Sequence, residues 1–205
     1  MTESFDDKAR TWDDDPKRIA RANAVAEGIR AQVPLSRQMT GFEYGCGTGL
    51  LSFALLPHLK HIVLADSSGG MLAVLRGKIA SQDIPNMEAI KLDLAADPLP
   101  DGQFSIVYTM MTLHHIVETD LILRHFHALL EPSGHLCIAD LDQEDGSFHG
   151  PDFHGHKGFD RKTLARDARN AGFHNIEFST IFEIRKGDGQ EETTYPVFLM
   201  VAEKT

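Results

Sequence analysis

Runs with the pattern of buried strands alternate with runs of helical pattern along most of this chain. The strand-like runs lie at 39–45, 61–66, 87–94, 104–111 and 135–142, and the helical runs at 13–33, 50–59, 67–80, 119–130 and 160–172. Two longer strand-like runs, 175–186 and 193–204, follow, with the polar loop 187–192 between them as in a hairpin. This alternation predicts an α/β fold with a doubly wound, mostly parallel sheet and helices on both faces.

A length of 205 residues suits one domain, so we expect a single domain over 1–205. Its first 33 residues form a segment of their own, in which an acidic, polar start holds the only tryptophan, Trp12. A helix then begins at Pro16, and Asp15 is placed to cap it. The core is expected over 34–205, with 142–159 as a loop over the active site.

The charge balance limits the partners. Twenty Lys and Arg residues stand against 30 Asp and Glu residues, which gives a net charge of -10. Nucleic acid and anionic membranes both favour basic surfaces, so neither is predicted as a partner. Two cysteines, Cys46 and Cys137, make no disulfide framework and indicate a reducing compartment. Without an apolar signal region or an 18-residue apolar run, we expect a cytoplasmic protein with no membrane partner. Its oligomeric state stays open.

The stretch "EYGCGTG", residues 43–49, directly follows the first strand-like run. Its glycines at 45, 47 and 49 can adopt backbone angles closed to other residues and let a ligand approach the main chain. The spacing G-x-G-x-G differs from the G-x-G-x-x-G of dinucleotide-binding folds, which argues against a pyrophosphate. Glu43 is placed to accept hydrogen bonds from the ammonium end of an amino-acid-like ligand. A turn without function is the simpler alternative.

Acidic residues end the next two strands. Asp66 comes 21 residues after Gly45, a spacing that suits a carboxylate accepting hydrogen bonds from a ribose diol. The alternative is a helix cap, a role that Ser67 or Ser68 could equally fill. Asp93 and Leu94 pair an acceptor with an apolar surface, as an adenine ring requires.

These motifs together resemble the class I S-adenosylmethionine-dependent methyltransferases, and within them the small-molecule, UbiE-like branch of types 11 and 12. The resemblance covers nearly the whole chain and rests on "EYGCGTG", "VLADSSGGML", "LDL", "FSIVYTMMTLHHI" and "LLEPSGHLCIADLD", in the family's order and spacing. One departure is Ser105, where many members have Asp.

The resemblance implies a Rossmann-like, seven-stranded sheet whose last strand is antiparallel. It implies S-adenosylmethionine as cofactor, S-adenosylhomocysteine as product, and a small-molecule methyl acceptor. The implied cofactor contacts are Glu43, Tyr44, Gly45, Cys46, Gly47, Thr48, Gly49, Asp66, Ser67, Met71, Asp93, Leu94 and Met110. Two alternatives stay open, a nicotinamide-dependent oxidoreductase and a protein that binds S-adenosylmethionine without catalysis.

Methyl transfer needs a base only where the acceptor must lose a proton. His114 and His115 follow the fourth strand, where a substrate would lie, and either is a candidate base. The alternative is that one or both bind backbone and pack the following helix.

The stretch 138–159 is rich in acids and histidines: Asp140, Asp142, Glu144, Asp145, His149, His154 and His156. A solvated loop, a divalent-metal site and a polar lid that selects the substrate are the three interpretations. We favour the lid and predict no metal ligands, with Asp140 and His149 as candidate substrate contacts. Trp12 is a further candidate contact that closes over the pocket, or else it anchors the first helix to the core.

Overall fold

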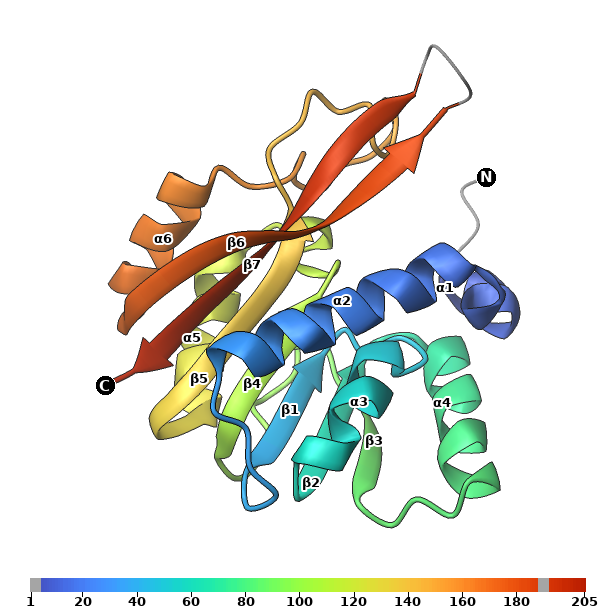
Figure 1. The fold of residues 1–205 in the computed structure, drawn as a ribbon, viewed down its shortest axis with the longest axis vertical. Helices are drawn as coiled ribbons and strands as arrows, with labels where there is room; N and C mark the ends of the chain where they lie inside the picture. Colours follow the sequence, from blue (N-terminus) through green and yellow to red (C-terminus); the bar gives the residue numbers. More distant parts are fainter. Residues whose placement is uncertain (1–4, 188–191) are drawn as a thin grey trace.

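The computed structural model describes residues 5–187 and 192–205, and its centre is a seven-stranded sheet in the order β3-β2-β1-β4-β5-β7-β6 (Figure 1). The strands are β1 (Thr40–Tyr44), β2 (His61–Asp66), β3 (Met87–Lys91), β4 (Phe104–Met110), β5 (Leu130–Leu141), β6 (Phe173–Lys186) and β7 (Thr193–Lys204). β7 runs antiparallel to both of its neighbours, β5 and β6, whereas the pairs among β1 to β5 are parallel. The predicted α/β fold with a terminal antiparallel strand is therefore confirmed.

The helices flank this sheet on both faces. They are α1 (Phe5–Lys8), α2 (Pro16–Gln32), α3 (Leu50–Leu55), α4 (Gly69–Ser81), α5 (Thr119–Leu129) and α6 (Arg161–Asn170). Short 3-10 turns are η1 (Ala9–Asp14), η2 (Leu56–His58) and η3 (Leu113–His115). As predicted, α2 starts at Pro16, and the Asp15 carboxylate accepts a hydrogen bond from the N–H of Lys17. Among the described residues, no helix has both the length and the apolar character needed to cross a membrane.

Successive side chains of the central strands point to opposite faces of the sheet, so there is a hydrophobic core on each face. On one face, Ile106 and Tyr108 of β4 pack with α2, α3 and α4, whose buried residues include Val25, Leu51 and Leu72. On the other face, Val107 packs with buried residues of α5 and α6. Figure 1 shows α2 crossing the near face of the sheet and α5 behind it. Because both faces are covered, the strands carry nearly continuous apolar runs.

Several element ends differ from the predicted ones. The strand predicted over 87–94 ends at Lys91, since Asp93 begins a turn in which its carbonyl accepts from the N–H of Asp97. The helix predicted over 50–59 gives way to η2 at Leu56, next to Pro57. β5 begins at Leu130 and not at 135, and β6 begins at Phe173 and not at 175. Residues 188–191 of the predicted hairpin loop lie outside the described residues.

The β6–β7 hairpin is long, and its far half projects beyond the rest of the sheet (Figure 1). There it supports the segment 142–159. The Lys186 ammonium donates to the carbonyl of Phe148, and the Ser147 and Tyr195 hydroxyls lie 2.8 Å apart. Segment 142–159 is thus held against the β6–β7 hairpin, and its predicted role as an active-site loop stays a prediction.

Candidate functional site

The glycine loop lies between the ends of β1 and α3, where the strand order reverses between β1 and β4. Ligands of doubly wound sheets bind at this switch point. Gly45, Gly47 and Gly49 all have positive φ, at 66°, 53° and 84°. A Cβ at Gly45 would lie 2.2 Å from Cγ2 of Thr112, whose hydroxyl donates to the Gly45 carbonyl. Only glycine fits this close approach of β1 to the segment after β4.

The space around Gly47 is wider. A Cβ built there would come no closer than 3.9 Å to any other side chain, and its nearest neighbours would be Met71 and Trp12. Below it, the Asp66 carboxylate accepts hydrogen bonds from the Gly47 N–H at 2.7 Å and from the Ser68 N–H at 2.8 Å. Asp66 does not cap α4, because Ser68 does so by accepting from the N–H of Met71. The predicted alternative role of Asp66 as the cap is therefore excluded.

Glu43 lies beneath the loop and is 1% exposed. Its Oε2 accepts from the Ser52 hydroxyl at 2.5 Å, and the Ser52 and Tyr108 hydroxyls lie 2.7 Å apart. Burial raises the pKa of Glu43 to about 8, although the Ser52 hydrogen bond opposes this shift. In this conformation the carboxyl group is turned to Ser52, so a direct contact with the ammonium group of a ligand stays a prediction.

The end of β3 is linked to the end of β1. The Tyr44 hydroxyl lies 3.4 Å from Oδ1 of Asp93 and accepts from the Leu94 N–H at 3.2 Å. Leu94 is fully buried and belongs to the core on the α5 face. Its side chain is therefore a packing group, and the predicted apolar surface for an adenine ring stays a prediction.

The remaining predicted cofactor residues lie around the same loop. Cys46 and Thr48 are buried within it, and Met71 is 2% exposed at the start of α4. Ser67 is exposed next to Asp66, and Met110 is half-buried at the end of β4. The structure thus brings the predicted set to one edge of the sheet.

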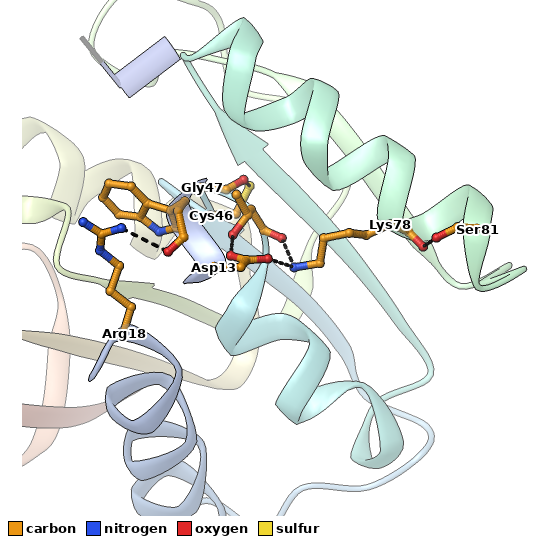
Figure 2. A network of polar contacts seen from close by, with 8 residues as sticks. Asp13, Arg18, Cys46, Gly47, Lys78 and Ser81 are labelled. Carbon is orange, nitrogen blue, oxygen red and sulfur yellow. Dashed lines mark hydrogen bonds and ion pairs between the residues drawn. The ribbon is translucent and has the colours of Figure 1, made fainter. Parts of the chain in front are cut away.

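Residues 5–14, which we call the N-terminal strap, lie across this edge. The Asp13 carboxylate accepts from the Thr48 hydroxyl at 2.5 Å and from the Lys78 ammonium at 2.8 Å. Lys78 also donates to the Thr48 carbonyl, and Figure 2 shows it reaching from α4 toward Asp13. The glycine loop, the strap and α4 are therefore tied together at one point.

Further contacts hold the strap at both ends. Asp6 accepts from the Ser68 hydroxyl and, at 2.8 Å, from the Gly70 N–H at the start of α4. The Arg18 guanidinium lies 3.9 Å from the centre of the Trp12 ring and donates to the Trp12 carbonyl (Figure 2). The structure places Trp12 beside Gly47 and stacks it on Arg18, so both predicted roles of Trp12, closing the pocket and anchoring the first helix, stay open.

A histidine cluster lies at the ends of β4 and β5. Nδ1 of His114 is 2.6 Å from Oδ1 of Asp140, and both side chains are buried. Because a carboxylate accepts hydrogen bonds, Nδ1 of His114 carries the hydrogen in this contact. Asp140 also accepts from the N–H groups of His114 and Leu141. The structure therefore brings together Asp140 and His114, which the sequence placed in separate roles.

His115 and His149 complete the cluster. The ring centres of His114 and His115 lie 4.2 Å apart, and His149 lies 5.0 Å from the former and 5.3 Å from the latter. Burial, followed by the charge of His114, lowers the pKa of both His115 and His149 to about 4. Both imidazoles are thus neutral at pH 7. His149 belongs to segment 142–159. This segment folds back onto η3, where the His156 N–H donates to the His114 carbonyl at 2.7 Å.

The acidic residues of segment 142–159 pair with other partners. Asp142 forms a two-point ion pair with Arg161, with both distances at 2.6 Å. Glu144 and Asp145 accept from backbone N–H groups within the segment. A cavity of about 370 Å³ lies beside the start of α6, where Gln143, His156, Gly158 and Phe159 of this segment line it together with Thr119, Asp160 and Thr163 among others. It contains no residue of the glycine loop.

Sequence reasoning missed Asp6, Asp13, Lys78 and Thr112, which hold the strap and the loop. Their partners lie 30 to 67 positions away in the chain, and no local pattern marks them. Ser52 was also missed, although its place one helical turn after the glycines could have indicated a contact below the loop.

Comparison with known proteins also indicates a methyltransferase. A family model described as "Methyltransferase domain" matches residues 42–134. A methyltransferase of Schizosaccharomyces pombe is 33% identical over 156 residues, which are 68% of this chain and 55% of that protein. A ubiquinone biosynthesis O-methyltransferase of Marinobacter nauticus is 27% identical over 108 residues, 52% of this chain and 45% of that protein. The chain spans about half the length of these curated relatives.

Solved structures share the fold at low sequence identity. A Haloferax volcanii methyltransferase in complex with the Trm112 methyltransferase activator has a TM-score of 0.79 at 18% identity, covering 99% of this chain and 98% of that one. Phosphoethanolamine N-methyltransferase 2 of Haemonchus contortus, in complex with S-adenosyl-L-methionine, has a TM-score of 0.73 at 15% identity, covering 89% and 52%. These likenesses show the shared fold, whereas the sequence matches, with the strand order and the glycine loop, show that the chain belongs to the class I S-adenosylmethionine-dependent methyltransferase family.

Proposed function

We propose that the protein binds S-adenosylmethionine over the glycine loop and transfers its methyl group to a small-molecule acceptor. The observation that carries this proposal is the pairing of Gly47 with Asp66. The carboxylate holds the loop through the Gly47 N–H, and each oxygen keeps a further acceptor site for a ribose hydroxyl. The G-x-G-x-G spacing disfavours a nicotinamide dinucleotide at the same place.

The residues of the chain would contribute to catalysis mainly by positioning the reactants. Methyl transfer is an in-line displacement at a carbon that the sulfonium already activates, so the protein must align the acceptor and exclude water. The strap supports exclusion of water, because Asp13 and Trp12 lie against the loop and Phe5 lies 5.3 Å from His115, measured between ring centres. Where the acceptor must lose a proton, His114 is the better placed of the two predicted bases, since Asp140 fixes its tautomer.

A small-molecule acceptor is supported by the names of relatives and by charge. The matched proteins include a ubiquinone biosynthesis O-methyltransferase and the demethylmenaquinone methyltransferase of Clavibacter sepedonicus, which is 32% identical over 112 residues. A Haemonchus contortus neighbour was solved with phosphomonomethylethanolamine and S-adenosylhomocysteine. The net charge of -10 disfavours nucleic acid. We also propose a cytoplasmic location, which the two free, buried cysteines support.

The test is product formation. The protein is incubated with S-adenosylmethionine and with separate pools of small hydroxyl, amine, thiol and activated-carbon compounds, and S-adenosylhomocysteine is quantified. We expect release above the background without acceptor in at least one pool. Tight binding of S-adenosylhomocysteine with no release in any pool would favour the alternative of a binding protein without catalysis.

A further inference from the structure

We propose that His114, His115 and His149 form a binding site for a divalent transition-metal ion of the zinc type. One ring nitrogen from each residue lies within 4.8 Å of the other two. Two of the residues come from η3 after β4, and the third comes from segment 142–159 after β5. Residues 35 positions apart in sequence thus converge on one point.

The free nitrogen of His114 is the observation that points to a ligand. His114 is 1% exposed, and its Nε2 has no hydrogen-bond partner among residues 5–187 and 192–205. A buried imidazole nitrogen without a partner costs free energy, as other unsatisfied buried polar groups do. A bound metal ion would satisfy this nitrogen, whereas packing alone leaves it unsatisfied.

Asp140 provides the second part of a metal-binding arrangement. Histidine ligands of metals usually donate their other ring N–H to a carboxylate, which fixes the tautomer and makes the ligating nitrogen more basic. Nδ1 of His114 makes this contact with Asp140 at 2.6 Å. Asp140 is itself held by two backbone N–H groups and is 0% exposed. His114 is therefore oriented before any ion arrives.

Closing the site on an ion requires only small ring movements. A zinc–nitrogen distance is about 2.0–2.1 Å, so two ligand nitrogens lie at most about 4.2 Å apart. The present separations are within 4.8 Å. His149 stacks on Phe153 at 3.9 Å between ring centres, and His115 meets Phe5 and Phe153 edge-on. These aromatic contacts hold the rings near one another.

The ligand set favours one class of ion. Three imidazole nitrogens suit zinc and similar first-row ions, whereas magnesium and calcium prefer oxygen. Asp140 and Glu144 contribute negative charge near the cluster, and Lys8 and Lys186 contribute positive charge. The opposing lysines make the affinity lower than that of a structural zinc site. Three protein ligands also leave a coordination position open, as in catalytic sites.

This site differs from the one that the sequence suggested. Acids and histidines within 140–156 were the sequence-based candidates, and the lid interpretation was preferred to a metal. Of those histidines only His149 joins the cluster, whereas the ring of His156 contacts the Val117 carbonyl and Phe159. His114 and His115 complete it because segment 142–159 folds back onto η3.

The role of the ion rests on the proposed function. With an ion bound, His114 would serve as a ligand and not as the base, and an acceptor hydroxyl or thiol in the open position would lose its proton to solvent more readily, because the ion stabilises the anion. The acceptor's lone pair then forms the new bond to the methyl carbon as the carbon–sulfur bond breaks, and that electron pair stays on sulfur. The cluster is linked to the glycine loop through Thr112, two residues before His114, whose hydroxyl donates to the Gly45 carbonyl.

The experiment uses the whole chain, freed of metal by a chelator and titrated with Zn²⁺ against a competing chelator of known affinity. His149→Gln and His115→Gln remove ligands. His154→Gln is the matched control, because it removes an exposed histidine of the same segment that lies outside the cluster. Circular dichroism and thermal melting establish that each variant is folded. If His115→Gln does not fold, the exposed His149 decides the test.

We expect one tight equivalent of Zn²⁺ in the unmodified protein and in His154→Gln, with affinities within about 2-fold of each other. We expect His149→Gln and His115→Gln to bind at least about 10-fold more weakly, the scale seen for lost metal-site interactions. The proposal is overturned if the unmodified protein takes up no tight equivalent, or if His149→Gln binds like His154→Gln. No S-adenosylmethionine is present, so this result is independent of the proposed methyl transfer.

Discussion

The Asp66 carboxylate, at the end of β2, accepts a 2.7 Å hydrogen bond from the backbone N–H of Gly47 in the neighbouring loop. One residue thereby holds the shape of the glycine loop and presents an acceptor beside it. The sequence spacing that indicated Asp66 was counted from the glycine loop. The structure now links Asp66 directly to that loop. Burial raises the pKa of Asp66, and the hydrogen bonds from Ser68 and Gly47 oppose this shift.

Replacing Asp66 should weaken binding of S-adenosylhomocysteine. Losing a charged acceptor costs about 1.5–3 kcal/mol, which is roughly 10- to 150-fold in affinity. Asp66→Asn keeps one acceptor oxygen, so its loss should be smaller than that of Asp66→Ala. Calorimetry measures both, with Asp83→Asn, an exposed residue at the end of α4, as the control. Unchanged affinity in folded Asp66→Ala would show that Asp66 serves the loop alone.

Two neighbouring glycine substitutions should separate stability from binding. In Gly45→Ala the new Cβ meets Thr112 at 2.2 Å, so we expect the free energy of unfolding to fall by about 2–4 kcal/mol. Gly47→Ala meets nothing closer than 3.9 Å and should lose only about 1–2 kcal/mol from its left-handed backbone. Its methyl group would nevertheless narrow the open side of the loop and reduce cofactor affinity. Denaturant unfolding and calorimetry on both variants check this, and equal losses of stability would contradict it.

The raised pKa of Glu43 predicts how the free energy of unfolding depends on pH. Its pKa of about 8 in the folded protein lies above the ordinary value of 4.5, so the folded state holds a proton that the unfolded chain releases between these pH values. Its contribution to stability is complete below pH 4.5 and declines as pH rises through 8, by up to about 1.4 kcal/mol per pH unit. Glu43→Gln cannot titrate. Its stability relative to the unmodified protein should therefore increase between pH 5 and 8, by up to about 3.5 kcal/mol in total.

Urea unfolding at several pH values measures this difference, because contributions from other groups cancel between the two proteins. Glu27→Gln, an exposed position on α2, is the control and should show no such trend. A pH-independent difference for Glu43→Gln would mean that Glu43 is ionised in the folded protein.

Asp13 should control the opening of the strap. The Asp13–Lys78 pair is partly exposed, at 32% and 23%, and pairs of this kind contribute about 0.2–1 kcal/mol. Asp13→Asn should therefore change global stability by less than about 1 kcal/mol. It should accelerate hydrogen exchange in residues 9–14 and the dissociation of S-adenosylhomocysteine, both by up to about 5-fold. Asp14→Asn, at the exposed neighbouring position, should change neither rate. Equal exchange rates in the two variants would exclude a role for Asp13 in holding the strap.

Local patterns were sufficient for the fold because each strand and helix carries its own periodicity and turn residues. Reliance on local patterns also misplaced the start of β5. The residues 131–134 have the composition of a turn, yet Leu130 pairs with Phe104 across an irregularity in the β4–β5 ladder, and Ser133 takes a positive φ of 63°. Tertiary pairing there overrides the local preference.

For the site, the residues that follow the strands could be predicted, since parallel strands bring their carboxyl ends to one edge. The contacts between distant segments could not. Asp13 and Lys78 are 65 positions apart, and His149 meets His114 only because segment 142–159 folds back onto η3. Sequence spacing placed Glu43 beside the ligand, whereas its pairing with Ser52 below the loop depends on how α3 packs.

The central claim is that the glycine loop and Asp66 bind the S-adenosyl group. Its most direct test is parallel titration calorimetry of the unmodified protein with S-adenosylhomocysteine and with NAD. The account predicts saturable binding of S-adenosylhomocysteine, at one molecule per chain, and no measurable binding of NAD. Tight binding of NAD without binding of S-adenosylhomocysteine would contradict it.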